Sequence, residues 1–238
     1  VVSKLLERLV ARQLIDYLSA ERLLPDLQSA YRRYHSTETA LLKVLSDILR
    51  AVDSGDLSVL TLLDLSAAFD TVDHATLLRR LVASYGLDGC AISWFQSYLE
   101  GRTQYVRCRS SCSSPTRLLC GVPQGSVLGP ILFLLYTAEL LQLIQSHDLH
   151  PHLYADDTQI YGFCRPSATA QLQNRMITCI DNVSSWMRSN RLQLNTAKTE
   201  VMWCASARRQ HQLPDGPMMI RSIRRSVTRP VLQSLVAS

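Results

Sequence analysis

Two adjacent carboxylates lie in the segment Leu-Tyr-Ala-Asp-Asp-Thr-Gln-Ile-Tyr, which covers residues 153–161. Asp156 and Asp157 stand between two short apolar, aromatic-rich runs, where burial and like charge both disfavour ionisation. Aspartate also favours tight turns, so a plain hairpin turn is the structural alternative. Neighbouring residues of a regular strand point to opposite faces. Both carboxylates can therefore serve one site only if the chain turns between the two runs.

A third carboxylate, Asp64, comes near the end of the apolar run 57–65, which predicts a buried strand. Taken alone, an aspartate at a strand end is as compatible with a turn or a helix cap as with catalysis. Three carboxylates at strand ends could instead hold two divalent cations about 3.5–4 Å apart. Mg²⁺ suits such oxygen ligands and leaves room for substrate phosphates. The combination favours phosphoryl transfer.

The elements that must position these residues alternate in type along the chain. Helical periodicity covers residues 2–18, 37–54, 75–85, 90–99, 127–146 and 167–190, and Ser36 and Thr37 can cap the second of these helices. Strand patterns cover 57–65 and 199–206, the segments 103–109 and 116–120 predict a hairpin, and 152–163 predicts a strand, a turn and a second strand. The glycine- and proline-containing segment 121–130 is a loop that opens into a helix, whose free N–H groups would favour phosphate. This mixture predicts an α+β fold with a hairpin-rich sheet.

Composition and charge limit the classes of protein to which the chain can belong. Hydrophobic residues make up 47% and charged residues 19% of the 238 positions, and no uninterrupted apolar run reaches the length of a membrane span. The net charge of +5 belongs to residues 206–238, where six arginines face the single acid Asp215. Residues 1–205 are neutral, which excludes a strong overall basic footprint for nucleic acid. Seven cysteines without a CxxC pair predict free thiols rather than zinc.

Four segments occur in one characteristic order: "LLDLSAAFDTVDH" at 62–74, "GVPQGSVLGPILFLLY" at 121–136, "YADDTQIY" at 154–161 and "LQLNTAKTEVMW" at 192–203. Together they resemble the palm motifs of reverse transcriptases, and residues 1–205 are similar to the reverse transcriptase domain of LINE-type (non-LTR, jockey-like) retrotransposons. The resemblance implies a right-hand polymerase fold, with an antiparallel palm sheet backed by helices. It assigns 1–56 and 75–120 mainly to partial fingers and 57–74 and 121–205 to the palm. Residues 206–238 would be a basic divergent tail outside the core.

The resemblance also implies roles for residues of the acidic group. Asp64 and Asp156 would be the principal ligands of two Mg²⁺ ions, for which Mn²⁺ could substitute, and Asp157 would complete the cluster. The backbone carbonyl of Leu65 would contact the ion that carries the nucleotide. Lys198 matches a lysine near the leaving pyrophosphate and is a candidate general acid, although an exposed lysine alone would indicate nothing.

Three further residues match substrate-binding positions. Phe69 corresponds to an aromatic gate that excludes the ribose 2′-hydroxyl, whereas its structural alternative is a plain core residue. Gln124 and Gly125 would lie near the incoming nucleotide and the template base. A two-metal nuclease would leave Phe69 and Gln124 unexplained, and the aromatic ring of Phe69 argues against an RNA-dependent RNA polymerase.

The implied function is RNA-directed DNA polymerisation, the addition of dNTPs to a primer 3′-end. The implied partners are an RNA template, a DNA primer or target and dNTPs. No membrane partner is expected, and the resemblance implies no particular oligomeric state. Nuclear action is expected, although no targeting signal is visible.

The chain begins inside a helical pattern without Met, which predicts a fragment. Because a preceding finger strand and a primer-grip hairpin are not recognisable, the alternative is an inactive remnant or an RNA-binding module that keeps the fold.

Overall fold

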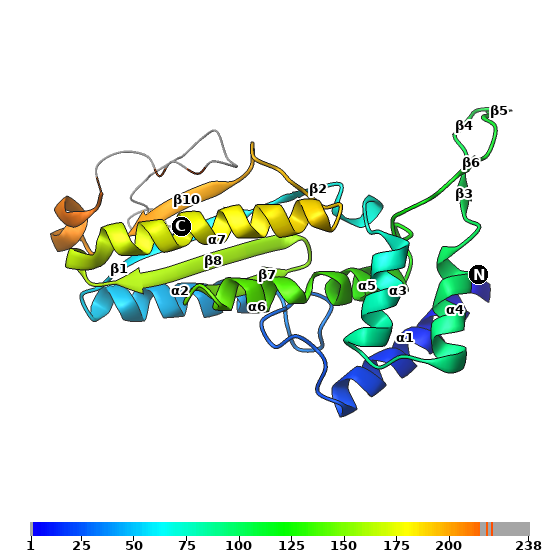
Figure 1. The fold of residues 1–238 in the computed structure, drawn as a ribbon, viewed down its shortest axis with the longest axis horizontal. Coiled ribbons are helices and arrows are strands. Elements are labelled where there is room, and N and C mark those ends of the chain that lie inside the picture. The colour runs from blue at the N-terminus through cyan, green and yellow to red at the C-terminus, as the bar shows by residue number, and fades with distance from the viewer. Residues whose placement is uncertain (1, 215–217, 219, 221–238) are drawn as a thin grey trace. The chain divides into compact units, whose positions relative to one another are not determined.

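A computed structural model of the protein describes residues 2–214, 218 and 220 (Figure 1). Backbone packing divides them into two compact units. The first unit contains residues 2–24, 67–137 and 190–192, and the second contains 25–66, 138–189 and the described residues from 193 onward. Helices and antiparallel strands occur together, as an α+β fold requires. The predicted fold class is confirmed.

The second unit is built on a four-stranded sheet with the order β10-β1-β8-β7. Its strands are β1 (Leu57–Leu63), β7 (His150–Tyr154), β8 (Asp157–Cys164) and β10 (Glu200–Cys204), and all neighbours are antiparallel. β1 is an inner strand, and six of its seven residues are buried. A strand covered on both faces favours a mainly apolar run over an alternating one, and residues 57–63 are apolar except for the buried Ser58 and Thr61.

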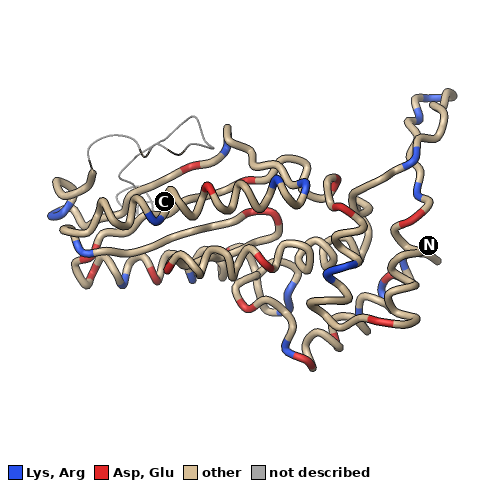
Figure 2. The backbone as a smooth tube through the Cα atoms, viewed as in Figure 1, with Lys and Arg blue, Asp and Glu red and all other residues tan. Residues whose placement is uncertain are grey.

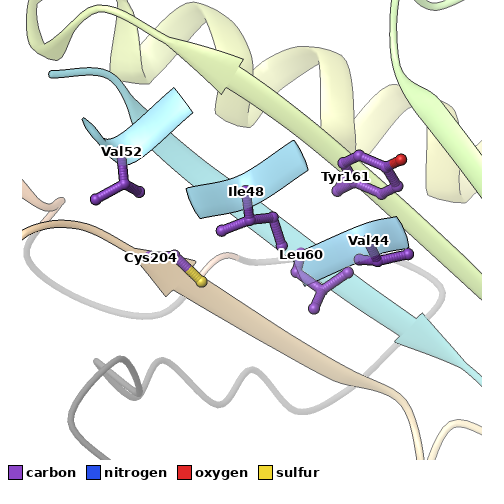
Figure 3. Close-up of a cluster of buried hydrophobic side chains, with 6 residues drawn as sticks. All are labelled: Val44, Ile48, Val52, Leu60, Tyr161 and Cys204. Carbon is purple, nitrogen blue, oxygen red and sulfur yellow. The ribbon is translucent and has the colours of Figure 1, made fainter. Parts of the chain in front are cut away.

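Helices cover both faces of this sheet. Helix α2 (Thr37–Asp53) begins at Ser36, whose hydroxyl accepts from the Thr39 N–H in a capping box, and the sequence predicted this start. Its buried side chains pack on three strands in one apolar cluster (Figure 3), formed by Val44, Ile48, Val52, Leu60, Tyr161 and Cys204. Helix α7 (Thr169–Ser189) covers the opposite face, where it packs directly against Gly162 of β8. Helix α6 (Glu139–Gln145) runs beside β7.

The first unit is mainly helical, with α1 (Val2–Ala20), α3 (His74–Ala83), α4 (Gly89–Leu99) and α5 (Leu128–Thr137). The hairpin expected from residues 103–120 forms two short ladders, β3 (Thr103–Gln104) with β6 (Thr116–Arg117) and β4 (Arg107–Cys108) with β5 (Ser111–Cys112). The apolar stripe of α1 is only partly used: Leu14 and Leu18 are buried, whereas Leu5, Leu6 and Leu9 remain about half exposed. Periodicity located the helix but overstated its burial.

One segment is apolar enough on average to cross a membrane, although it is not an uninterrupted apolar run. The window Leu128–Gln145 is long and apolar enough, by composition, to cross a membrane, and 67% of it is buried inside the protein. Helix α5 has nine buried residues among its ten. A helix that is apolar all round and buried in this way is typical of a protein core.

Short elements complete the described chain. They are the two-residue strands β2 (Leu65–Ser66) and β9 (Gln193–Leu194), which pair with each other, and the 3-10 helices η1 (Ala68–Asp70), η2 (Pro166–Ala168) and η3 (Ala207–Gln212). Within the predicted tail, residues 206–214, Met218 and Ile220 are described, and the last two are buried. The other tail residues lie outside the described part. The division into fingers, palm and tail is functional and stays a prediction.

Candidate active site

The paired carboxylates lie at a tight turn of the second unit. Tyr154 at the end of β7 pairs with Asp157 at the start of β8, so that only Ala155 and Asp156 form the loop. Ala155 has φ 55°, in the left-handed region that a residue with a side chain rarely adopts. The turn that both carboxylates require is confirmed, and it forms an acidic stretch between β7 and β8 (Figure 2).

Asp64 reaches the same place through strand pairing. It follows β1 directly, and Leu63 of β1 pairs with Thr158, the residue after Asp157. A pocket of about 250 Å³ is lined by Leu62, Leu63, Asp64, Asp157, Thr158, Gln159 and Lys198. Two predicted catalytic carboxylates and the predicted lysine therefore share one pocket. Asp156 is not among its lining residues.

The carboxylate of Asp64 has two partners from one loop. Lys198 Nζ lies 3.5 Å from Asp64 Oδ2, and Asn195 Nδ2 donates a hydrogen bond to the same oxygen at 2.9 Å. The Asn195 N–H also donates to the Asp64 carbonyl at 2.8 Å. Asn195 was missed from sequence, although it lies in the motif that singled out Lys198. It sets the direction of Asp64 while the lysine supplies the charge.

Negative charge accumulates on Asp157. Its pKa is raised above the ordinary value, first because the surrounding protein partly desolvates the charged carboxylate, although the residue as a whole is exposed, and then because Asp156 and Asp64 carry the same charge. Lys198 acts in the opposite direction but does not cancel these effects. A cluster of this kind attracts a cation, which would relieve the repulsion.

Asp157→Asn is expected to raise the midpoint of thermal unfolding at pH 7. Because the pKa of this carboxyl is higher in the folded chain, its contribution to stability is fully present below the unfolded value, about 3.9. That contribution is lost as the pH rises through the folded pKa. The gain from Asp157→Asn should therefore shrink as the pH falls toward 4. Differential scanning calorimetry between pH 4 and 8 measures it, with the exposed Asp26→Asn as control. A lower midpoint at pH 7 would contradict the expectation.

The oxygen donors fit a magnesium ion in type, since Mg²⁺ takes carboxylates and carbonyls in preference to nitrogen or sulfur. Within residues 2–214, 218 and 220, no three or more His, Cys, Asp or Glu side chains converge as a metal-holding group. Leu65 follows Asp64 in β2, and its side chain is buried, so only its backbone could contact an ion. The described residues therefore offer suitable oxygen ligands for a magnesium ion, but their side chains do not surround one position.

A second group of predicted residues lies in the first unit. The ring of Phe69 packs on Phe133, with centroids 4.6 Å apart, and Phe69 is half-buried rather than enclosed in the core. The Val122 N–H donates to the Phe69 carbonyl at 2.8 Å. Gln124 Nε2 lies 3.2 Å from both carboxylate oxygens of Asp70. The motif that contains Phe69 and the loop that contains Gln124 are thus joined directly.

The N-terminus of α5 corrects one expectation from sequence. Its first N–H groups were predicted to favour phosphate, but the carboxylate of Glu7 accepts from the Val127 N–H at 2.7 Å and from the Leu128 N–H at 3.4 Å. A carboxylate at a helix start satisfies these donors and complements the dipole. The donors are therefore used within the protein. Gln124 and Gly125 are both exposed, and Gly125 has φ 73° with open space beside it.

Gly121→Ala is expected to lower the free energy of unfolding by about 1–3 kcal/mol. Gly121 has φ 88°, and a Cβ there would lie 2.8 Å from the carbonyl oxygen of Asp70, which is backbone and cannot swing away. The matched control is Gly101→Ala, because Gly101 has φ 68° with nothing within 4 Å. Urea denaturation should show a larger loss for Gly121→Ala. Equal losses would mean that the close contact between Gly121 and the Asp70 carbonyl does not affect stability.

Comparison with known proteins gives a consistent result. Residues 1–216 match the family described as reverse transcriptase (RNA-dependent DNA polymerase). The chain is 34% identical over 205 residues to "Probable RNA-directed DNA polymerase from transposon BS" of Drosophila melanogaster, a match that covers 83% of this chain and 22% of that protein. It is 38% identical over 141 residues to the corresponding X-element protein of the same species, covering 59% and 15%. The chain thus spans less than a quarter of each relative's length.

Solved structures with a similar fold include a telomerase from Candida tropicalis in complex with a fragment of telomeric RNA. The TM-score is 0.61 at 15% identity, over 82% of this chain and 33% of that one. An apo form of the telomerase truncated from the C-terminal domain gives a TM-score of 0.59 at 11% identity, over 84% and 40%. These likenesses support the polymerase fold of palm and fingers. The chain therefore belongs to the reverse transcriptase (RNA-dependent DNA polymerase) family, and its relatives are of the LINE-type, non-LTR kind that its motifs resemble.

Proposed function

We propose that the chain carries the catalytic centre of an RNA-directed DNA polymerase, which adds dNTPs to the 3′-end of a primer on an RNA template. The observation that carries the proposal is the shared pocket of Asp64, Asp157 and Lys198, with Asp156 in the adjoining turn. Three carboxylates and a lysine suit the transfer of a phosphoryl group, whose negative charge must be held and balanced.

The carboxylates would bind two divalent cations, Mg²⁺ or Mn²⁺ in its place. Such ions, when bound, stabilise the attacking and leaving oxygens of an in-line displacement. Asp64 and Asp156 would be the principal ligands, with Asp157 and the Leu65 carbonyl beside them. Asn195 would keep Asp64 directed into the pocket after Lys198 has turned away. The 3.5 Å ion pair of Lys198 is exposed and weak, so the lysine can exchange one partner for another.

Lys198 would then approach the leaving pyrophosphate and give it a proton. Phe69 would lie against the sugar of the incoming nucleotide, and Gln124 and Gly125 would lie near its base. The Asp70 carboxylate already engages the amide nitrogen of Gln124. The carbonyl oxygen of that side chain therefore remains as its acceptor for substrate.

The partners that follow are an RNA template, a DNA primer or target and dNTPs. The fingers–palm division and the tail at 206–238 belong to the same proposal, as does action in the nucleus at chromosomal DNA. The neutral charge of residues 1–205 suggests that much of the grip on nucleic acid comes from local contacts.

Primer extension tests the proposal. The full chain is incubated with Mg²⁺, a primed RNA template and either dNTPs or rNTPs, and product length is read on a gel. Extension with dNTPs supports a polymerase. Template binding without extension under Mg²⁺ or Mn²⁺ would support the alternative, an RNA-binding module that retains the fold. Extension only with rNTPs would identify an RNA polymerase instead.

A further inference from the structure

The acidic turn is contacted by a buried side chain from a distant part of the second unit. Gln28 is only 1% exposed. Its Oε1 accepts from the Ala155 N–H at 3.2 Å, and its Nε2 donates to the Ala155 carbonyl at 3.4 Å. Oε1 also accepts from the Ala30 N–H at 3.0 Å. One side-chain amide thus pairs with both main-chain groups of the residue that precedes Asp156.

The segment around Gln28 is fixed to β7. The Leu153 N–H donates to the Leu27 carbonyl at 2.8 Å, and the Ser29 N–H donates to the Leu153 carbonyl at 3.0 Å. Ser29 Oγ lies 3.0 Å from His152 Nε2, and both side chains are buried. Because β7 is an edge strand, these bonds satisfy part of an otherwise open edge. Gln28 is therefore held in place from both sides.

Arg32 closes the same segment on itself. Its Nη1 donates to the carbonyl of Pro25 at 2.8 Å and, at 3.4 Å each, to the carbonyls of Asp26 and Gln28. This guanidinium nitrogen therefore holds the loop that contains Gln28. We call residues 25–32 the Gln28 loop. Charge-assisted bonds to three carbonyls make it a rigid support.

The turn needs such a support for two reasons. The left-handed conformation of Ala155 costs a residue with a Cβ about 1–2 kcal/mol. Asp156 and Asp64 also repel Asp157. Both effects favour opening of a loop that contains only two residues. A neutral amide can oppose the opening without adding charge beside the carboxylates.

We propose that Gln28 is a positioning residue for the acidic turn: its side-chain amide fixes the main chain of Ala155 and thereby the directions of the Asp156 and Asp157 carboxylates. This inference rests on the proposed polymerase function but concerns a residue outside the four motifs. Gln28 touches no substrate and acts through Ala155.

The test compares Gln28→Met with the wild-type full chain. Methionine keeps the length and the buried volume but removes both hydrogen bonds to Ala155, together with the one from the Ala30 N–H. Amide exchange of Ala155, followed by NMR, should accelerate by about 10-fold, the equivalent of one lost hydrogen bond of ordinary strength. In primer extension, kcat should fall by about 10–10²-fold, as expected for misplaced reacting groups. KM for dNTPs should change little, because Gln28 is only 1% exposed and is closed to a soluble substrate.

Ser29→Ala is the matched control. It removes a neighbouring buried hydrogen bond, to His152, but leaves the amide of Gln28 and the main-chain bonds to Leu153 intact. It should lower the melting temperature without changing Ala155 exchange or kcat. If Ser29→Ala reproduced the kcat loss of Gln28→Met, the effect would be one of general stability and the positioning role would be wrong.

Two other results would also overturn the inference. Unchanged amide exchange of Ala155 in Gln28→Met would show that the Gln28 hydrogen bonds do not hold the Ala155 main chain. Faster exchange with unchanged kcat would show that these hydrogen bonds do not contribute to catalysis. Should the wild-type chain not extend primers at all, the proposed function fails separately. The affinity of the acidic cluster for Mn²⁺, measured by electron paramagnetic resonance, then replaces kcat. Weakening by about 10-fold or more in Gln28→Met supports the inference, and equal affinity overturns it.

Discussion

Asp156→Asn is expected to lower the rate of primer extension by at least about 10³-fold. Asparagine has nearly the same shape, so the two-residue turn can form, but the negative charge is lost. A metal-held charge in such a site contributes several kcal/mol to the transition state. Since about 1.4 kcal/mol corresponds to a tenfold change in rate, a loss of this size follows. Single-nucleotide incorporation under saturating dNTP measures it directly.

Asp157→Asn provides the internal comparison. Asp157 lines the pocket and carries the raised pKa, but the motif gives the principal ligand role to Asp156. We therefore expect a smaller loss for Asp157→Asn than for Asp156→Asn, with Asp26→Asn unchanged. A rate for Asp156→Asn within tenfold of wild type would show that the carboxylates do not hold the catalytic ions, and the site would have to lie elsewhere.

Phe69→Ala is expected to raise the use of rNTPs relative to dNTPs by about 10–10²-fold in kcat/KM, which is the range in which a hydrophobic pocket discriminates by size. Phe69 is half-buried, with Phe133 behind its ring, so the ring has a fixed support and a free side. Removal of the ring would leave space for a 2′-hydroxyl. Competition between each rNTP and its dNTP on one template gives the ratio.

Phe69→Tyr distinguishes a role of Phe69 in excluding the 2′-hydroxyl from a role in packing alone. Tyrosine keeps the ring and its contact with Phe133, and discrimination should stay near the wild-type value. Both variants should be compared at a temperature well below their melting points, because Phe69→Ala also loses part of the contact with Phe133. If Phe69→Ala incorporates rNTPs no better than wild type, Phe69 is a packing residue and the gate assignment is wrong.

Much of the fold was predictable because it depends on short-range patterns. The capped start of α2 at Ser36, the continuous apolar strand β1 and the turn between Tyr154 and Asp157 all follow from residues close together in sequence. The proximity of Asp64 to Asp157 followed only from the motif order. Periodicity could not supply it, because it does not tell which strands pair.

Other features could not be read from sequence because they are single contacts between distant segments. Glu7 caps α5, Asn195 directs Asp64, and Gln28 holds Ala155. Each is an ordinary polar residue within a helix or a loop, and its own neighbours give no sign of the partner. The paired strands β2 and β9 have two residues each, too few for any periodicity to be visible.

The inner position of β1 has a consequence for biosynthesis. β1 pairs with β8 on one side and with β10 on the other, and β10 ends at Cys204. At about 5–20 residues per second, roughly 7–28 s separate the synthesis of β1 from that of its last partner. During that interval a mostly apolar strand, with only Ser58 and Thr61 polar, has open edges and can pair with other chains. Nascent chains of this protein are therefore expected to require a chaperone, and translation that stops before β10 should give aggregates rather than a smaller folded domain.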